Sequence, residues 1–300
     1  MASPSESSRL QQQGILFMVA GTMIAPGMDA IAKFLGESLS PLLITWGRFT
    51  VQSILLATAL VVAGGFSALR SNRPYIHLLR GVLLATATLC FFWALNHMPL
   101  AECIAVFFVQ PMILTVLSAV FLGETIGWHR RIAVVAGFIG ALIIIRPGTS
   151  SFTLYYLLPL LAAVFYASYL TVTRAHATAD NSAVQLMTSG VGGVLFLSVW
   201  LLLAEIYPNS WSWTQPTVPQ WGWLVCIGII AALAHALIIM GMSRAPASVL
   251  APFGYSEIIA ATLLGWLIFG DWPNASAWLG VLIIIGSGCY VAWRETLQTS

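Results

Sequence analysis

Charged side chains are scarce in this sequence. Asp, Glu, Lys and Arg make up only 7% of its 300 residues, whereas soluble domains carry about 25%. The formal net charge is +2 and no cluster of Lys or Arg occurs, so the chain lacks the phosphate-binding track expected of a nucleic-acid-binding protein. Four cysteines stand singly without a C-x-x-C pair, which excludes a disulfide scaffold and disfavours metal or redox use.

The motifs of intramembrane enzymes and of ATP-driven pumps are also missing. The sequence contains no H-E-x-x-H zinc motif and no G-x-x-x-x-G-K-[ST] phosphate-binding loop. No two acidic residues lie within four positions of each other, as a Mg²⁺ site built from clustered carboxylates would need. We therefore expect neither a cofactor nor a metal.

Long apolar runs dominate what is present. Hydrophobic residues make up 59% of the chain, and a bilayer core of about 30 Å is crossed by about 20 apolar residues in a helix. The sequence predicts an all-α membrane protein with ten transmembrane helices, a tail at 1–12 and another at 295–300. The predicted spans are 13–35, 41–63, 77–97, 99–122, 130–146, 152–173, 183–205, 221–243, 247–270 and 275–293.

Arginine placement predicts the orientation. Lys and Arg collect on the cytoplasmic side of membrane proteins. With the N-terminus inside, the outer segments hold only Arg146. The cytoplasmic segments then hold Arg9, Arg70, Arg73, Arg130, Arg131, Arg174, Arg244 and Arg294. We expect a multi-pass protein of the cell inner membrane with both termini in the cytoplasm.

The chain also contains a weak internal repeat. A shift of 147 residues lays the fourth predicted span over the ninth. Two halves of five spans each, 13–148 and 149–294, would have to insert in opposite orientations. Inverted repeats are typical of alternating-access transporters, whose substrate site lies near mid-membrane between the repeats. The matched pairs include Pro99 with Pro246, Phe108 with Tyr255, and Gln110 with Glu257.

Several runs resemble the EamA domain of the drug/metabolite transporter superfamily. APFGYSEIIAATLLGWLIFGDWPNASAWLGVLIIIGSGCYVAWRE (251–295) is similar to its closing unit, and the segment 99–148 is similar to the first-half counterpart with its L-G-E and R-P-G endings. MDAIAKFLG (28–36) and WGRF (46–49) resemble the start of the first repeat. The resemblance implies ten helices, a central cavity and cytoplasmic termini. Members of the superfamily export amino acids and drugs, or import riboflavin, nucleotide-like cofactors or sugars.

Polar residues at matched central positions predict the substrate and coupling site. Glu257 lies about ten residues into the ninth span, and its counterpart Gln110 lies in the middle of the fourth. Charged groups within the membrane are costly and functional by default, so Glu257 is a candidate proton carrier; a hydrogen-bonded structural role is the alternative. The other candidates, each with a packing role as its alternative, are Tyr255, Trp93, His235 and Tyr169.

Four further charged residues are candidates for gating or ion pairing. Asp29 and Lys33 are four residues apart on the first span and so share a helix face, either as a mutually neutralised pair or as a gate. Arg48 lies about seven residues inside the second span and needs an acidic partner, for which Asp29 and Glu102 are candidates. Glu102 itself lies in the first turn of a helix, where a carboxylate favours the helix dipole.

Taken together, these features predict an alternating-access transporter of a small organic metabolite, with protons as possible coupling ions. The sequence leaves two kinds of cargo open: export of an amino-acid-like metabolite, or import of a flat cofactor such as riboflavin. An intramembrane enzyme and a channel are the alternative functions, and the chain could act as a monomer or a homodimer. Prolines within the spans would let helices bend around a cavity; they are Pro26, Pro111, Pro159 and Pro252.

Overall fold

The computed structural model describes residues 4–123, 127–149, 152–176, 182–206 and 214–299. Within these ranges all regular secondary structure is helical. The α-helices are α1 (Pro4–Leu35), α2 (Pro41–Gly64), α3 (Pro74–Leu95), α4 (Leu100–Phe107), α5 (Gln110–Leu122), α6 (Trp128–Ile145), α7 (Leu158–Ala175), α8 (Ser182–Ile206), α9 (Val218–Met242), α10 (Ala247–Gly254), α11 (Ser256–Phe269) and α12 (Ala275–Thr299). Short 3₁₀ turns, η1 (Phe66–Leu69) and η2 (Leu154–Leu157), join α2 to α3 and precede α7.

Ten segments of the described chain are long and apolar enough to cross a membrane. Their limits agree with the predicted spans to within a few residues, which confirms the all-α membrane fold. The first helix begins earlier than predicted, since α1 starts at Pro4 and includes most of the tail expected at 1–12.

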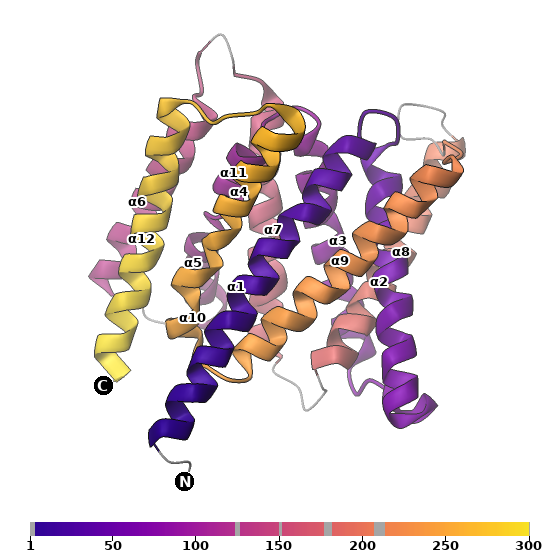
Figure 1. The fold of residues 1–300 in the computed structure, drawn as a ribbon, viewed down its shortest axis with the longest axis horizontal. Coiled ribbons are helices and arrows are strands. Elements are labelled where there is room, and N and C mark those ends of the chain that lie inside the picture. Colours follow the sequence, from indigo (N-terminus) through magenta and orange to yellow (C-terminus); the bar gives the residue numbers. More distant parts are fainter. Residues whose placement is uncertain (1–3, 124–126, 150–151, 177–181, 207–213, 300) are drawn as a thin grey trace.

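The fourth and ninth spans are each broken near their middle. Between α4 and α5, Pro111 has no N–H to donate to the carbonyl of Phe107, which weakens the helix at this point, and α5 begins beside it. Between α10 and α11, the N–H of Tyr255 donates to the carbonyl of Pro252 at 3.3 Å, a tighter turn than the α-helix makes. The two breaks lie at corresponding points of the two spans (Figure 1).

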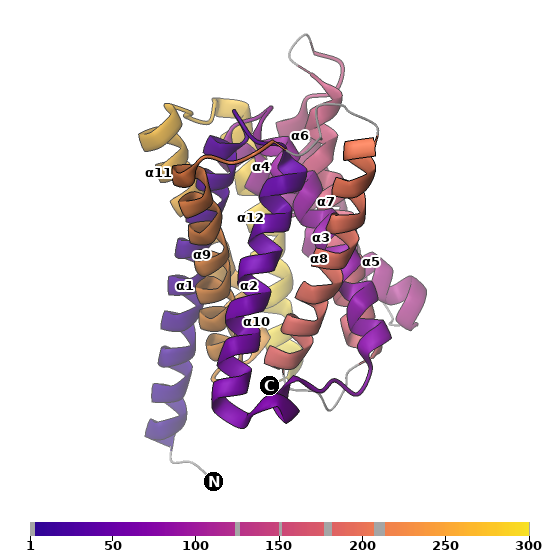
Figure 2. The same cartoon turned by 90° about the vertical axis from the view of Figure 1, so that its right-hand side faces the viewer.

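Both chain ends lie at the same end of the helix bundle, the lower end in Figure 1. We call this the termini end and the opposite one the far end. Helix α1 packs along α9, and α3 packs between α7 and α8 (Figure 2). The broken helices meet in the far half, where α4 packs on α11. In the termini half α5 packs mainly on α7 and α6, whereas α10 packs on α12 and α1, so the two broken helices diverge there.

The far end is closely packed. Helix α4 is buried from Leu100 to Val106, and Leu95 and Ile144 beside it are fully buried. Helix α5, in the termini half, instead exposes Val120 and Phe121, which are suited to face lipid. The far half is therefore closed by apolar packing, while the termini half is more open.

Glycine allows the closest helix contacts, as is common in membrane proteins. A Cβ at Gly81 of α3 would overlap the backbone of Ser189 and Gly193 in α8. Gly140 of α6 and Gly280 of α12 approach each other in the same way. These contacts hold the outer helices against the bundle.

Candidate functional site

A cavity of about 170 Å³ lies at the level of the helix breaks. Two acidic side chains, an arginine and a histidine reach it from four helices: Asp29 from α1, Arg48 from α2, His235 from α9 and Glu257 from α11. We call it the central cavity. Because the bilayer core solvates charge poorly, this concentration of ionisable groups needs either mutual compensation or a polar solute.

Arg48 and Asp29 compensate each other in part. Both are 4% exposed, and their opposite charges attract across the cavity wall. One guanidinium nitrogen of Arg48 donates to the hydroxyl of Thr88 at 2.7 Å, and the group lies over the ring of Phe49, 5.0 Å from its centroid. Of the two acids expected to serve Arg48, Asp29 is the one that lines the same cavity.

Glu257 owes its position to the helix break. It lies in the first turn of α11, where the N-terminal end of a helix stabilises negative charge, and it lines the central cavity. His235 is held by its own helix, because Nδ1 donates to the carbonyl of Ala231 at 2.8 Å. In the neutral ring Nε2 is then a hydrogen-bond acceptor.

Aromatic rings form one wall of the central cavity. Phe91 and Tyr166 each contact Phe107 edge-on, with centroids 5.4 Å apart. Tyr169 lies behind this wall, 5.7 Å from Tyr166, and its hydroxyl accepts a hydrogen bond from Arg80 at 3.2 Å. Tyr169 therefore supports the wall and does not line the cavity.

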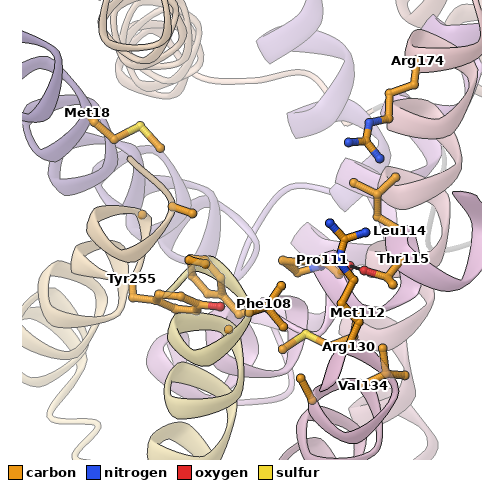
Figure 3. A pocket seen from close by; sticks show the side chains of 16 residues that line it. Met18, Phe108, Pro111, Met112, Leu114, Thr115, Arg130, Val134, Arg174 and Tyr255 are labelled. Atoms are coloured by element: carbon orange, nitrogen blue, oxygen red, sulfur yellow. Dashed lines mark hydrogen bonds between the residues drawn. The ribbon is translucent and has the colours of Figure 1, made fainter. Parts of the chain in front are cut away.

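A second cavity, of about 340 Å³, lies in the termini half where α5 and α10 diverge, and Figure 3 shows the side chains that line it. We call it the termini-side cavity. Phe108 and Tyr255, one from each helix break, pack together in it with centroids 5.0 Å apart. Tyr255 therefore lines the termini-side cavity, whereas Glu257, two residues later, lines the central cavity. Gln110 is half-buried at the start of α5 and lines neither of these two cavities.

A cluster of charges closes the far end. Lys33 donates to Asp271 at 2.5 Å and to the carbonyl of Met98 at 3.2 Å. Arg146 lies 4.0 Å from Glu102 and donates to Asn274. We call these groups the far-end cluster.

Lys33 thus pairs with Asp271, whereas the sequence analysis gave Asp29 as its candidate partner. The long Lys33 side chain extends toward the bundle end, where charged groups are better hydrated, whereas Asp29 faces the interior. Glu102 belongs to the far-end cluster rather than to Arg48. Trp93 also lies toward this end, 6.0 Å from Tyr155, and lines neither the central nor the termini-side cavity.

The sequence does not predict two of the residues that bind these buried charged groups. Thr88 was overlooked because a hydroxyl in an apolar helix carries little signal, although a deeply buried guanidinium needs such acceptors. Asp271 gives no local signal either, because its partner Lys33 lies 238 residues away in the sequence.

Comparisons with known proteins show which family the chain belongs to. A model of the EamA-like transporter family matches residues 12–146 and 153–293. The chain belongs to this family. It is 30% identical to a riboflavin transporter of Brucella anthropi, over 93% of this chain and 98% of the relative. It is 26% identical to an S-adenosylmethionine uptake transporter of Rickettsia bellii, over 94% of each.

A solved crystal structure has the same fold, with a TM-score of 0.61 and 21% identity over 97% of this chain and 99% of the other. The protein is a multi-pass membrane transporter of small metabolites. The family and the names of its relatives point to transport rather than to an enzyme activity.

Proposed function

We propose that the protein is an alternating-access carrier built from two inverted five-helix repeats, 13–148 and 149–294. The observation that carries this proposal is the pair of helix breaks. Phe108 and Tyr255 are 147 residues apart (255 − 108), the same shift that aligns the repeats in sequence, and each begins the break in its span. Broken helices at mid-membrane are typical of transporter binding sites.

The protein lies in the cell inner membrane, with both termini in the cytoplasm. The excess of arginine at the termini end supports this orientation. The termini-side cavity then opens toward the cytoplasm, and the far-end cluster closes the outer side. In this arrangement the described structure is the inward-open state of the carrier.

The central cavity binds the solute, and a flat cofactor such as riboflavin suits it best. Phe91, Phe107 and Tyr166 offer ring faces and edges for stacking, and Arg48 and His235 offer polar contacts. At about 170 Å³ the cavity is smaller than the ~300–1,000 Å³ of most ligand pockets, so loading requires the helices to move apart.

A second candidate solute is an amino-acid-like metabolite. Arg48 and Asp29 lie in one wall with opposite charges, which matches a carboxylate and an ammonium group on the same small molecule. Uptake competition between riboflavin and a panel of amino acids separates the two candidates.

Glu257 carries the coupling proton. It shares the cavity with Asp29 and Arg48, so a proton on its carboxylate changes the charge that the solute meets.

Both cavities lie within one chain, which suits a monomer or a homodimer. The protein catalyses no chemical change in the solute.

Flux into proteoliposomes tests this mechanism. We expect wild-type riboflavin uptake to saturate, to be stimulated by riboflavin on the opposite side, and to respond to a pH gradient. Glu257→Gln keeps the size of the side chain but cannot ionise, so it should still exchange solute while losing the response to the gradient. Glu205→Gln, an exposed position at the far end, is the matched control.

Three results would contradict the proposal. A wild-type pH response in Glu257→Gln would make the residue a structural hydrogen-bonding partner. Flux that does not saturate would indicate a channel. Recovery of chemically altered riboflavin would indicate an enzyme.

A further inference from the structure

The central cavity contains hydrogen-bonding groups that the protein itself does not use. Within the described residues, only the hydroxyl of Thr88 accepts from the Arg48 guanidinium, although an arginine carries several N–H donors. Its Nε is buried without a hydrogen-bond partner. An unmet buried donor costs free energy, so an acceptor on the solute would be bound favourably here.

His235 offers the opposite kind of group. Its Nδ1 donates to the carbonyl of Ala231, so Nε2 of the neutral ring is left as an acceptor. The ring lines the same cavity, and Arg48 lies close enough for its positive charge to act on the ring. That charge disfavours a second cation, and among the described residues neither Asp29 nor Glu257 forms an ion pair with the ring. The cavity therefore holds an acceptor close to the donors of Arg48.

The rest of the cavity wall suits a flat ring. Phe91, Phe107 and Tyr166 line it from α3, α4 and α7, whereas Arg48 and His235 come from α2 and α9, which pack together. Aromatic side chains favour stacked or edge-on contact with another ring. A planar solute that lies against these rings presents its polar edge to the two residues from α2 and α9.

We propose that the central cavity recognises the imide edge of a planar ring, in which a carbonyl and an N–H stand side by side. The carbonyl accepts a hydrogen bond from Arg48, and the N–H donates to Nε2 of His235. Flavins and uracil carry such an edge. A site whose buried groups bind an N–H rejects an analogue that lacks it, because the acceptor of the site is left unpaired. The proposal rests on the function proposed above and makes His235 the residue that selects the solute.

Methylation of the imide nitrogen tests this contact. We would measure dissociation constants of the purified full-length protein in uncharged detergent for riboflavin and for uridine, each against its derivative methylated on that nitrogen. Methylation removes the N–H and leaves the ring and its carbonyls in place. In at least one of the two pairs it should weaken binding about tenfold or more, as expected for a buried acceptor left without a partner.

Variants at position 235 locate the preference for the unmethylated ligand. His235→Leu and His235→Phe remove the acceptor, so each should bind the two members of a pair about equally. His235→Gln keeps an amide oxygen as an acceptor and should retain part of the preference. Arg48→Lys alters the partner of the carbonyl, which both members share, so it should weaken the binding of both by a similar factor.

His176→Leu is the matched control. Nδ1 of His176 also donates to the carbonyl four residues before it, that of Val172. The residue is exposed, however, and lines neither the central nor the termini-side cavity. This variant should keep the wild-type preference, and size-exclusion profiles report on the folding of every variant.

Three results would overturn the proposal. The first is equal affinity for the two members of both pairs, or no measurable binding of any member. The second is a full preference in the Leu and Phe variants of His235, which would assign the N–H to Asp29 or Glu257. The third is a loss in His176→Leu as large as that in His235→Leu.

These binding results are separate from the test of transport. Riboflavin flux that saturates, together with binding that ignores methylation, would leave the carrier mechanism standing and reject the imide contact. Binding that depends on methylation and on His235, without riboflavin flux, would support the imide contact and reject riboflavin as the transported solute.

Discussion

The ion pair between Lys33 and Asp271 should control how often the far end opens. The two side chains are in contact at 2.5 Å and are 17% and 29% exposed. They join α1 to the segment that follows α11. If the carrier alternates as proposed, this contact exists only while the far end is closed, so its net energy adds directly to the stability of the inward-open state.

The energy follows from the separation and the partial exposure. At the 2.5 Å separation of Lys33 and Asp271, two unit charges attract by about 7 kcal/mol at an effective dielectric constant near 20. Desolvation and the ordering of the long Lys33 side chain offset much of this, which leaves about 1–2 kcal/mol. Loss of the pair should therefore raise the population of the outward-open state about 5- to 30-fold.

Labelling from the far side measures that population. In a background without the four native cysteines, Ala87→Cys places a thiol in the wall of the central cavity. An impermeant maleimide applied to the far side of sealed vesicles reaches this thiol only through the outward-open state. Since that state is the minor one, the labelling rate follows its population.

We expect Lys33→Gln and Asp271→Asn each to label about 5 to 30 times faster than the parent. The reversed pair, Lys33→Asp with Asp271→Lys, should restore slow labelling because the attraction returns. Glu37→Gln, an exposed acid at the same end, is the control and should label at the parental rate. Equal rates in parent and single variants, or a reversed pair that labels as fast as the singles, would refute the gating role.

Two other predictions concern topology and packing. Reporter fusions after Arg73, Arg174 and Arg244 should report the cytoplasm, and a fusion after Pro216 should report the outside; an external signal at Arg174 would contradict the proposed orientation. Gly288→Ala should lower thermal stability, by about 1–3 kcal/mol, because the new methyl group overlaps Tyr255. That loss should shrink in a Tyr255→Phe background, and an unchanged melting temperature would contradict the packing argument.

Span limits could be predicted from the sequence because run length and hydropathy depend on local composition alone. The positions of the helix breaks could be predicted only in part from the prolines in the sequence. Pro111 does interrupt its helix, but Pro26 lies within the continuous helix α1. Pro159 stands in the first turn of α7, where no backbone N–H is needed. A proline in an apolar run thus indicates a bend, a break or a helix start, and its position within the helix decides which.

Contacts between distant charges were less predictable. Spacing placed Asp29 and Lys33 on one helix face, and both do lie in α1. Their partners, however, depend on which helices approach α1 and at what depth. Arg48 lies near the start of the sequence and Asp271 near its end. The local spacing of Asp29 and Lys33 therefore could not indicate that Asp29 faces Arg48 or that Lys33 pairs with Asp271. Partner choice in a bundle is decided by depth and by which side chain can reach water.

The broken helices, the buried charges and the cavities require one another. Backbone that departs from the helix is tolerated at membrane depth only where it lines a cavity or is buried in protein. Charged side chains at that depth need opposite charges, helix ends or water. The α10–α11 break supplies a helix end to Glu257, and the cavity beside it brings in Arg48 and Asp29. An unbroken ninth span would remove the helix end and leave Glu257 beside Asp29 with only Arg48 to compensate both. The break is therefore a condition for keeping two carboxylates in the centre of the bundle.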